Sequence, residues 1–148
     1  GRNKKSYRFI QMADKLIQNM QKKAITAIQK QGTFRAPDTF QEVIENSEGI
    51  INRGTKMGEG WLLTSEMVTL IKNGVHNIVC CQPFACLPNH IVGKGVIKAI
   101  RKEYPKANIV AVDYDPGASE VNQLNRIKLM LSTANKNLKQ EPNGEKDA

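Results

Sequence analysis

Two short, uninterrupted apolar runs constrain the fold of this 148-residue chain more than any other feature. They are Asn77-Ile-Val-Cys-Cys81 and Asn108-Ile-Val-Ala-Val112, and neither has the alternation of a half-exposed strand. Such runs are typical of strands buried on both faces of a parallel sheet. A helical pattern lies between them and ends at Pro105, which supplies the crossover that parallel strands require. The sequence therefore predicts a Rossmann-like βαβ fragment of the α/β class with few parallel strands.

Amphipathic spacing predicts helices on both sides of this unit. From Ser6 to Gln31, apolar residues recur three and four positions apart, as in a long helix with one apolar face. Asn89 and Ser119 are suited to cap two later helices, because their side-chain oxygens can accept the free N–H groups of a first turn. In all, shorter helices are expected over 39–46, 61–73, 90–104 and 120–138.

Glycines mark two further features. Met57-Gly-Glu-Gly-Trp61 resembles a phosphate-binding loop only superficially, since it follows no clear strand and lacks the Gly-Lys-Ser/Thr ending. We expect a hinge or a tight helix start there instead. Gly93 and Gly95 lie inside an expected helix, where each costs up to about 1 kcal/mol relative to Ala. Close packing of that helix against a strand is the expected reason.

The chain divides into three predicted parts. These are a basic amphipathic helix over 1–35, an α/β domain over 36–139 with its βαβ core at 76–138, and a disordered tail over 140–148. Only two strands are predicted, and two strands seldom form a stable sheet alone. The chain also starts without Met. We therefore expect a domain fragment whose missing strands come from the rest of its polypeptide or from another chain.

The formal net charge of +8 is confined to the N-terminal part. Residues 1–35 hold nine basic residues against the single acid Asp14, and the remainder is neutral. A basic amphipathic helix suits a nucleic-acid or protein-binding module, which is the alternative function that we keep open. The segment contains no recognised nucleic-acid motif, so we do not expect a nucleic-acid partner. Its apolar stripe could instead cover part of a missing sheet or support self-association.

Hydropathy and cysteine usage indicate a compartment. No apolar run approaches the roughly 20 residues needed to span a bilayer, so no membrane partner is expected. Three Cys, two of them adjacent, make a poor disulfide framework. Reduced thiols in a cytoplasmic protein are the expected state.

Candidate site residues follow the first strand, because doubly wound sheets bind ligands beyond the carboxyl ends of their strands. Cys86 lies just before a helix, whose dipole favours a thiolate that binds metal or attacks an electrophile. Cys80 and Cys81 point to opposite faces of their strand, so at most one shares a site with Cys86. Apolar core filling is the alternative role for both. Cys86 with His90 gives at most half of a zinc site, and a simple exposed polar role for His90 is the alternative.

Polar residues also follow the second strand. Asp113 and Asp115 could coordinate a cation, or Asp115 could form an ordinary turn with the Pro-Gly that follows it. Arg126 could pair with Asp115 or Glu120 as a structural brace. Alternatively, a polar cluster on the first turns of the last helix could orient a cofactor: Asn122, Gln123, Asn125 and Arg126.

Three motifs resemble one protein family. They are Gly58-Glu-Gly-Trp-Leu-Leu63, Gln82-Pro-Phe-Ala-Cys-Leu-Pro-Asn-His90 and Val112-Asp-Tyr-Asp-Pro-Gly-Ala-Ser-Glu-Val-Asn-Gln-Leu-Asn-Arg126. Over roughly residues 35–135, the chain resembles the C-terminal end of the large CoA-substrate-specific enzyme activases. These are relatives of the 2-hydroxyacyl-CoA dehydratase and benzoyl-CoA reductase systems of anaerobic bacteria.

The resemblance carries expectations for the site. It implies that Cys86 is a metal ligand of a 4Fe–4S iron–sulfur cluster, with Cys81 as the second candidate. It also implies that Gln123 and Arg126 are cofactor-binding residues in a Gln-x-x-Arg helix motif. The activase's ATP-binding motifs and cluster cysteines are absent from this chain. ATP would therefore bind only in other domains, and the chain alone is not expected to be catalytic. The implied partners are the rest of its polypeptide and a CoA-thioester dehydratase or reductase.

Overall fold

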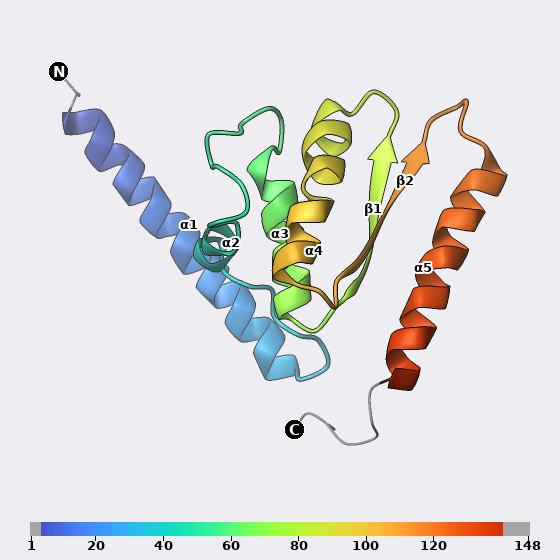
Figure 1. The fold of residues 1–148 in the computed structure, drawn as a ribbon. Coiled ribbons are helices and arrows are strands. Elements are labelled where there is room, and N and C mark those ends of the chain that lie inside the picture. The colour runs from blue at the N-terminus through green and yellow to red at the C-terminus, as the bar shows by residue number, and fades with distance from the viewer. Residues whose placement is uncertain (1–3, 141–148) are drawn as a thin grey trace. The chain divides into compact units, whose positions relative to one another are not determined.

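A computed structural model describes residues 4–140, which form two compact units that divide after Phe40. The first unit contains helix α1 (Lys4–Gln31), and helix α2 (Phe40–Asn46) begins at the boundary (Figure 1). The second unit continues with helix α3 (Trp61–Lys72), strand β1 (Asn77–Pro83), π-helix η1 (Asn89–Gly93), helix α4 (Ile97–Glu103), strand β2 (Asn108–Tyr114) and helix α5 (Glu120–Gln140). Apart from Gln140, which ends α5, the predicted tail over 140–148 lies outside the described residues.

The first unit is the amphipathic helix that the apolar spacing predicts. No described residue of α1 is buried, and the apolar side chains of Phe9, Leu16 and Met20 are all more than half exposed. A single helix has no partner for its apolar face, so this unit leaves that face open. Among residues 4–140, no helix combines the length and the apolar character needed to cross a membrane.

The second unit confirms the α/β class. Strands β1 and β2 run parallel, in a register that pairs Asn77 with Asn108 and Pro83 with Tyr114. The connection between them is helical, through η1 and α4, so the predicted βαβ unit is present. Within residues 4–140, the sheet has these two strands and no third.

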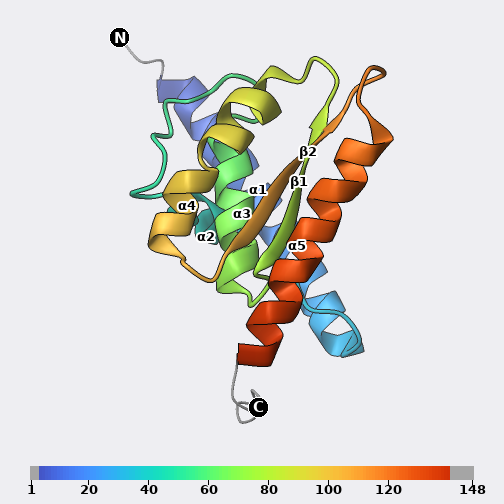
Figure 2. The same ribbon diagram turned by 45° about the vertical axis from the view of Figure 1, so that its right-hand side comes forward.

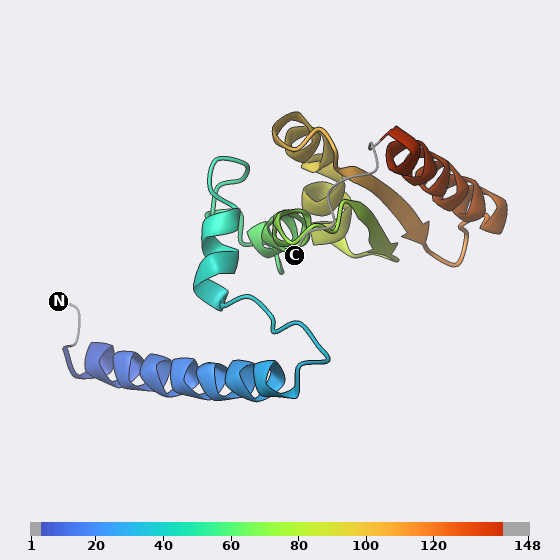
Figure 3. The same cartoon turned by 90° about the horizontal axis from the view of Figure 1, so that it is seen from below.

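Helices cover the sheet on two sides, as Figures 2 and 3 show. The core lies between the sheet and the helices α3 and α4, where Val68 and Ile100 pack with Ile78 and Ile109. The opposite face is covered by α5, which packs mainly on β2. Asn108 fixes this helix, because its Nδ2 donates to the Met130 carbonyl oxygen of α5 at 2.9 Å. Strand β1 consequently has less helical cover on the α5 side than β2 has.

The connection between the strands differs from the single helix predicted over 90–104. The helical run begins at Leu87, and Asn89 lies inside η1, so its predicted role as an N-cap is wrong. Pro88 is tolerated in the first turn because its missing N–H has no helical partner there. The Asn89 side chain donates instead to the Cys86 sulfur.

Two glycines confirm the predicted backbone constraints. Gly60 has φ +49°, and a Cβ at this position would lie 2.0 Å from the Thr55 carbonyl oxygen. That oxygen accepts the Trp61 N–H at 3.0 Å, so the segment forms a tight start for α3. A Cβ on Gly93 would lie 3.2 Å from the Cys80 sulfur, which confirms close packing of helix and strand. The same expectation for Gly95 is wrong, because nothing lies within 4 Å of its Cβ position.

Candidate functional site

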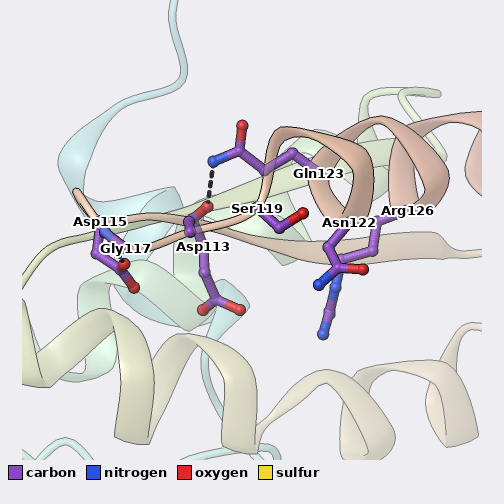
Figure 4. A pocket seen from close by; sticks show the side chains of 8 residues that line it. Asp113, Asp115, Gly117, Ser119, Asn122, Gln123 and Arg126 are labelled. Carbon is purple, nitrogen blue, oxygen red and sulfur yellow. Dashed lines mark hydrogen bonds between the residues drawn. The ribbon is translucent and has the colours of Figure 1, made fainter.

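A pocket lies where β2 ends and α5 begins, at the carboxyl edge of the sheet. Its volume is about 260 Å³, and Figure 4 draws the side chains around it. Strand β2 ends at this edge before Asp115-Pro-Gly117, because Pro lacks the N–H that a strand ladder requires. The lining residues come from the end of β2, the loop after it and the first turns of α5: Asp113, Asp115, Gly117, Ala118, Ser119, Asn122, Gln123 and Arg126.

Gln123 and Arg126 line this pocket while binding the backbone of β2. Gln123 Nε2 donates to the Asp113 carbonyl oxygen at 2.7 Å, the bond dashed in Figure 4. Arg126 Nη1 donates to the Ala111 carbonyl oxygen at 2.9 Å. The expected brace by Arg126 therefore exists, but it ends on the strand backbone and not on Asp115 or Glu120. Since a guanidinium has five N–H donors, Arg126 retains donors for a ligand in the pocket.

The two aspartates at the end of β2 and in the loop after it have different surroundings. Asp115 Oδ1 accepts the Gly117 N–H at 2.9 Å, which is the local turn chemistry expected for an Asp before Pro-Gly. Asp113 Oδ1 lies 3.8 Å from His90 Nε2 and 4.0 Å from Lys94 Nζ. These pairs are partly exposed and contribute little to stability. They do link the end of β2 with the helical segment after β1.

Cys86 lies after the turn that follows β1 and directly before the helical run at Leu87. Asn89 Nδ2 donates to its sulfur at 3.0 Å, and the thiol is half-buried. His90 turns its ring to the Cys86 backbone, with Nδ1 at 2.9 Å from the carbonyl oxygen. Cys86 and His90 therefore do not form half of a metal site in this arrangement.

The other two thiols lie on opposite faces of β1. Cys80 faces η1, next to Gly93, and accepts a hydrogen bond from Gln82 Nε2 at 3.2 Å. Burial raises the pKa of Cys80, the Gln82 bond opposes that shift, and the neighbouring Cys81 adds to it. Cys80 is thus held as a neutral thiol. Cys81 is exposed on the α5 side of the sheet, so it does not share a face with Cys80.

Sequence reasoning missed two polar partners of these thiols. Gln82 is fully buried, and its Oε1 has no hydrogen-bond partner. Asn89 Oδ1 would lie 3.7 Å from a Cβ on Gly93, so both amides approach the same glycine. The signal for Gln82 was available, because an amide at the end of a buried strand must find a partner inside the protein.

The donor set limits which metal group the chain can hold. Among residues 4–140, no three His, Cys, Asp or Glu side chains gather in a way that could bind a metal ion. An iron–sulfur cluster is typically held by several thiolates. Since no group of three exists, at least two of the four ligands of such a cluster must come from outside the described residues, and Cys86 would be one ligand of the set.

Comparisons with known proteins add no relative. No protein-family model, no curated protein and no solved structure matches this chain.

Proposed function

We propose that this chain is a Rossmann-like α/β domain of a CoA-substrate-specific enzyme activase related to the 2-hydroxyacyl-CoA dehydratases. In this proposal, Cys86 provides one thiolate ligand to a 4Fe–4S cluster whose other ligands lie outside this chain. The chain is an assembly domain with no catalytic activity of its own. The family assignment rests on the three sequence motifs that resemble those activases.

One observation carries the assignment of Cys86: its sulfur follows the carboxyl end of β1 and accepts a hydrogen bond from the side-chain Nδ2 of Asn89 at 3.0 Å. Hydrogen-bond donors to sulfur stabilise a metal-bound thiolate and tune cluster potentials. The competing thiols are less suited. Burial keeps Cys80 protonated, and Cys81 lies within β1, on the opposite face from Cys80. The buried Oε1 of Gln82, which lies near Cys80 in β1, is an acceptor with no hydrogen-bond partner.

Gln123 and Arg126 have a positioning role in this proposal. Both bind the β2 backbone, so they hold the first turns of α5 against the strand while lining the pocket at the carboxyl edge. A cofactor at that pocket would meet the remaining donors of Arg126 and the side chain of Asn122. The iron–sulfur cluster would supply electron-transfer chemistry when it is bound.

Anaerobic reconstitution of the full-length polypeptide with iron and sulfide tests the proposal. The absorption of the iron–sulfur chromophore is expected to fall in Cys86→Ala and to persist in Cys80→Ala, which removes a neutral thiol of the same strand region. An unchanged spectrum in Cys86→Ala would contradict the assignment.

A second candidate function is supported by α1, which is a separate compact unit with an open apolar face and a basic polar face. In this alternative, the helix binds a nucleic acid or an acidic protein surface. Nucleic-acid binding through such a helix would be dominated by phosphate contacts and would fall steeply with salt. That dependence separates the alternative from the cluster proposal.

A further inference from the structure

The two outer edges of the sheet differ in how their backbone groups are satisfied. The Asn108 N–H donates to the His76 carbonyl oxygen at 2.8 Å. In a parallel pair, alternate residues of each strand bond to the neighbour. The even-numbered residues of both strands therefore hold the ladder. The odd-numbered residues direct their N–H and C=O groups outward.

The outer edge of β2 is capped by side chains. Its outward carbonyl oxygens, those of Ile109, Ala111 and Asp113, accept hydrogen bonds from Arg101, Arg126 and Gln123 respectively. Arg101 comes from α4 and the other two donors come from α5, so the edge is closed from both faces of the sheet. A strand cannot add to an edge whose acceptors are already covered in this way.

The outer edge of β1 is open. Among the hydrogen bonds of residues 4–140, none outside the helices and the sheet ladder reaches the backbone of Val79 or Cys81. Pro83 accepts the Cys86 N–H at 3.1 Å, which ends the strand. The odd-numbered side chains of β1 are exposed, and 38% of the Val79 surface is accessible to solvent. An open edge beside an exposed apolar side chain is a template for pairing with another strand.

We propose that β1 pairs with β1 of a second copy of this chain, antiparallel and across a twofold axis. The resulting sheet has the order β2-β1-β1-β2. The charge pattern favours a second copy as the occupant. A strand that pairs with itself meets its own side chains, so any charge of one sign would meet like charge. None of the seven residues of β1 is charged.

The geometry also selects a register. Val79 and Cys81 both direct their backbone groups outward, so they form close hydrogen-bonded pairs when Cys80 lies opposite Cys80 of the second copy. Each Val79 then lies across from Cys81 of the second copy, and the seven residues of the strand overlap fully. The pairing converts a two-stranded sheet, which is marginal alone, into one with four strands.

This inference goes beyond the proposed function and does not rest on it. Antiparallel pairing puts the two carboxyl edges, and with them the two Cys86 loops, at opposite ends of the shared sheet. Loss of the dimer would therefore leave the cluster proposal untouched, and loss of the cluster would leave the dimer untouched.

Sedimentation of the 148-residue chain under reducing conditions tests the inference. The chain is expected to be a dimer at micromolar concentrations. Val79→Lys is expected to weaken the dimer at least about tenfold, because a charge at an open edge opposes strand pairing. Cys81→Glu is expected to weaken it similarly. The matched control is Leu129→Lys, which adds the same charge at an exposed position of α5 and is expected to leave the dimer intact.

The proposed register allows a more specific experiment. An equimolar mixture of Val79→Lys and Cys81→Glu is expected to restore dimers, since the lysine introduced in one variant then lies opposite the glutamate introduced in the other. Circular dichroism verifies that each variant is folded, and the exchanged pair Val79→Glu with Cys81→Lys replaces the first pair if one of its members unfolds. A monomeric wild-type chain, a dimer indifferent to both edge variants, or a dimer lost in Leu16→Lys of α1 but kept in Val79→Lys would each overturn the inference.

Discussion

Arg126 Nη1 lies 2.9 Å from the carbonyl oxygen of Ala111, so a helix side chain closes the outer edge of β2. Gln123 likewise donates to the next outward carbonyl oxygen of β2, that of Asp113. The two residues of the Gln-x-x-Arg motif are thus spaced to match alternate outward carbonyls of one strand. Their first role in the fold is to hold α5 on β2, and the pocket lies beside that contact.

This role predicts a stability loss. Arg126→Ala is expected to lower the free energy of unfolding by about 1–2 kcal/mol, because a charged donor is lost and a strand carbonyl is left without its partner. Lys128→Ala is the matched control, since it removes a basic residue from the same helix and is expected to change stability by less than about 0.5 kcal/mol. Urea unfolding measures both. Equal effects in the two variants would show that the edge contact contributes nothing.

Gly93 predicts a coupling between the helical connection and β1. Gly93→Ala adds a methyl group 3.2 Å from the Cys80 sulfur, and this crowding is expected to offset the roughly 1 kcal/mol that Ala gains in a helix. Gly95→Ala meets nothing within 4 Å and is expected to keep that gain. In a Cys80→Ala background, Gly93→Ala should recover the gain. Thermal unfolding of the four variants measures the coupling, and additive effects would contradict it.

Cys80 predicts a pH dependence at the alkaline end. Burial raises the pKa of Cys80 above its ordinary value of 9.0, so the folded chain keeps the proton that the unfolded chain loses. The stabilising contribution is complete below pH 9.0 and is lost as the pH rises through the higher folded value. Unfolding free energies measured across this range should fall more steeply for the wild type than for Cys80→Ala. Parallel curves would show that the thiol does not titrate differently in the two states.

The two thiols of β1 predict an order of chemical modification. Cys81 is exposed, whereas Cys80 is half-buried and has a raised pKa, so iodoacetamide should modify Cys81 well before Cys80. Peptide mapping by mass spectrometry after timed quenching measures the order. Cys80 reacting first would mean that the strand faces are assigned wrongly.

The two candidate functions predict different DNA binding by the basic helix α1. If α1 does not bind nucleic acid, fluorescence anisotropy should detect no binding of labelled duplex DNA near physiological salt. Binding there that weakens steeply with added salt would instead favour the alternative function.

Local patterns were enough to predict the elements of this fold. The continuous apolar runs around Val79 and Val110 lie in strands, and the segments with apolar residues three and four positions apart lie in helices. The two patterns differ because a strand buried on both faces is apolar throughout, whereas a helix buried on one face is apolar only at helical spacing. Asp115 and Gly60 were also predictable, since turn chemistry depends on near neighbours. In these cases the residues that decide the backbone conformation are near neighbours in the sequence.

Contacts between distant segments were not predictable in the same way. One failure was local: Asn89 fits an N-cap, but its side chain bonds to the thiol of Cys86 three residues earlier, and Pro88 lets the helix start before it. Arg126 had acidic neighbours in sequence, yet its partner is a strand carbonyl fifteen residues away. Which partner a long polar side chain selects depends on the packing of α5 on β2, which sequence spacing does not encode.

The iron content of the anaerobically reconstituted full-length protein tests the central proposal most directly. Cys86→Ala and Cys81→Ala form the matched pair, because each removes one thiol from the same strand-to-helix segment. The proposal predicts that Cys86→Ala loses most of the iron bound per polypeptide while Cys81→Ala keeps the wild-type amount. Wild-type iron content in Cys86→Ala would contradict it.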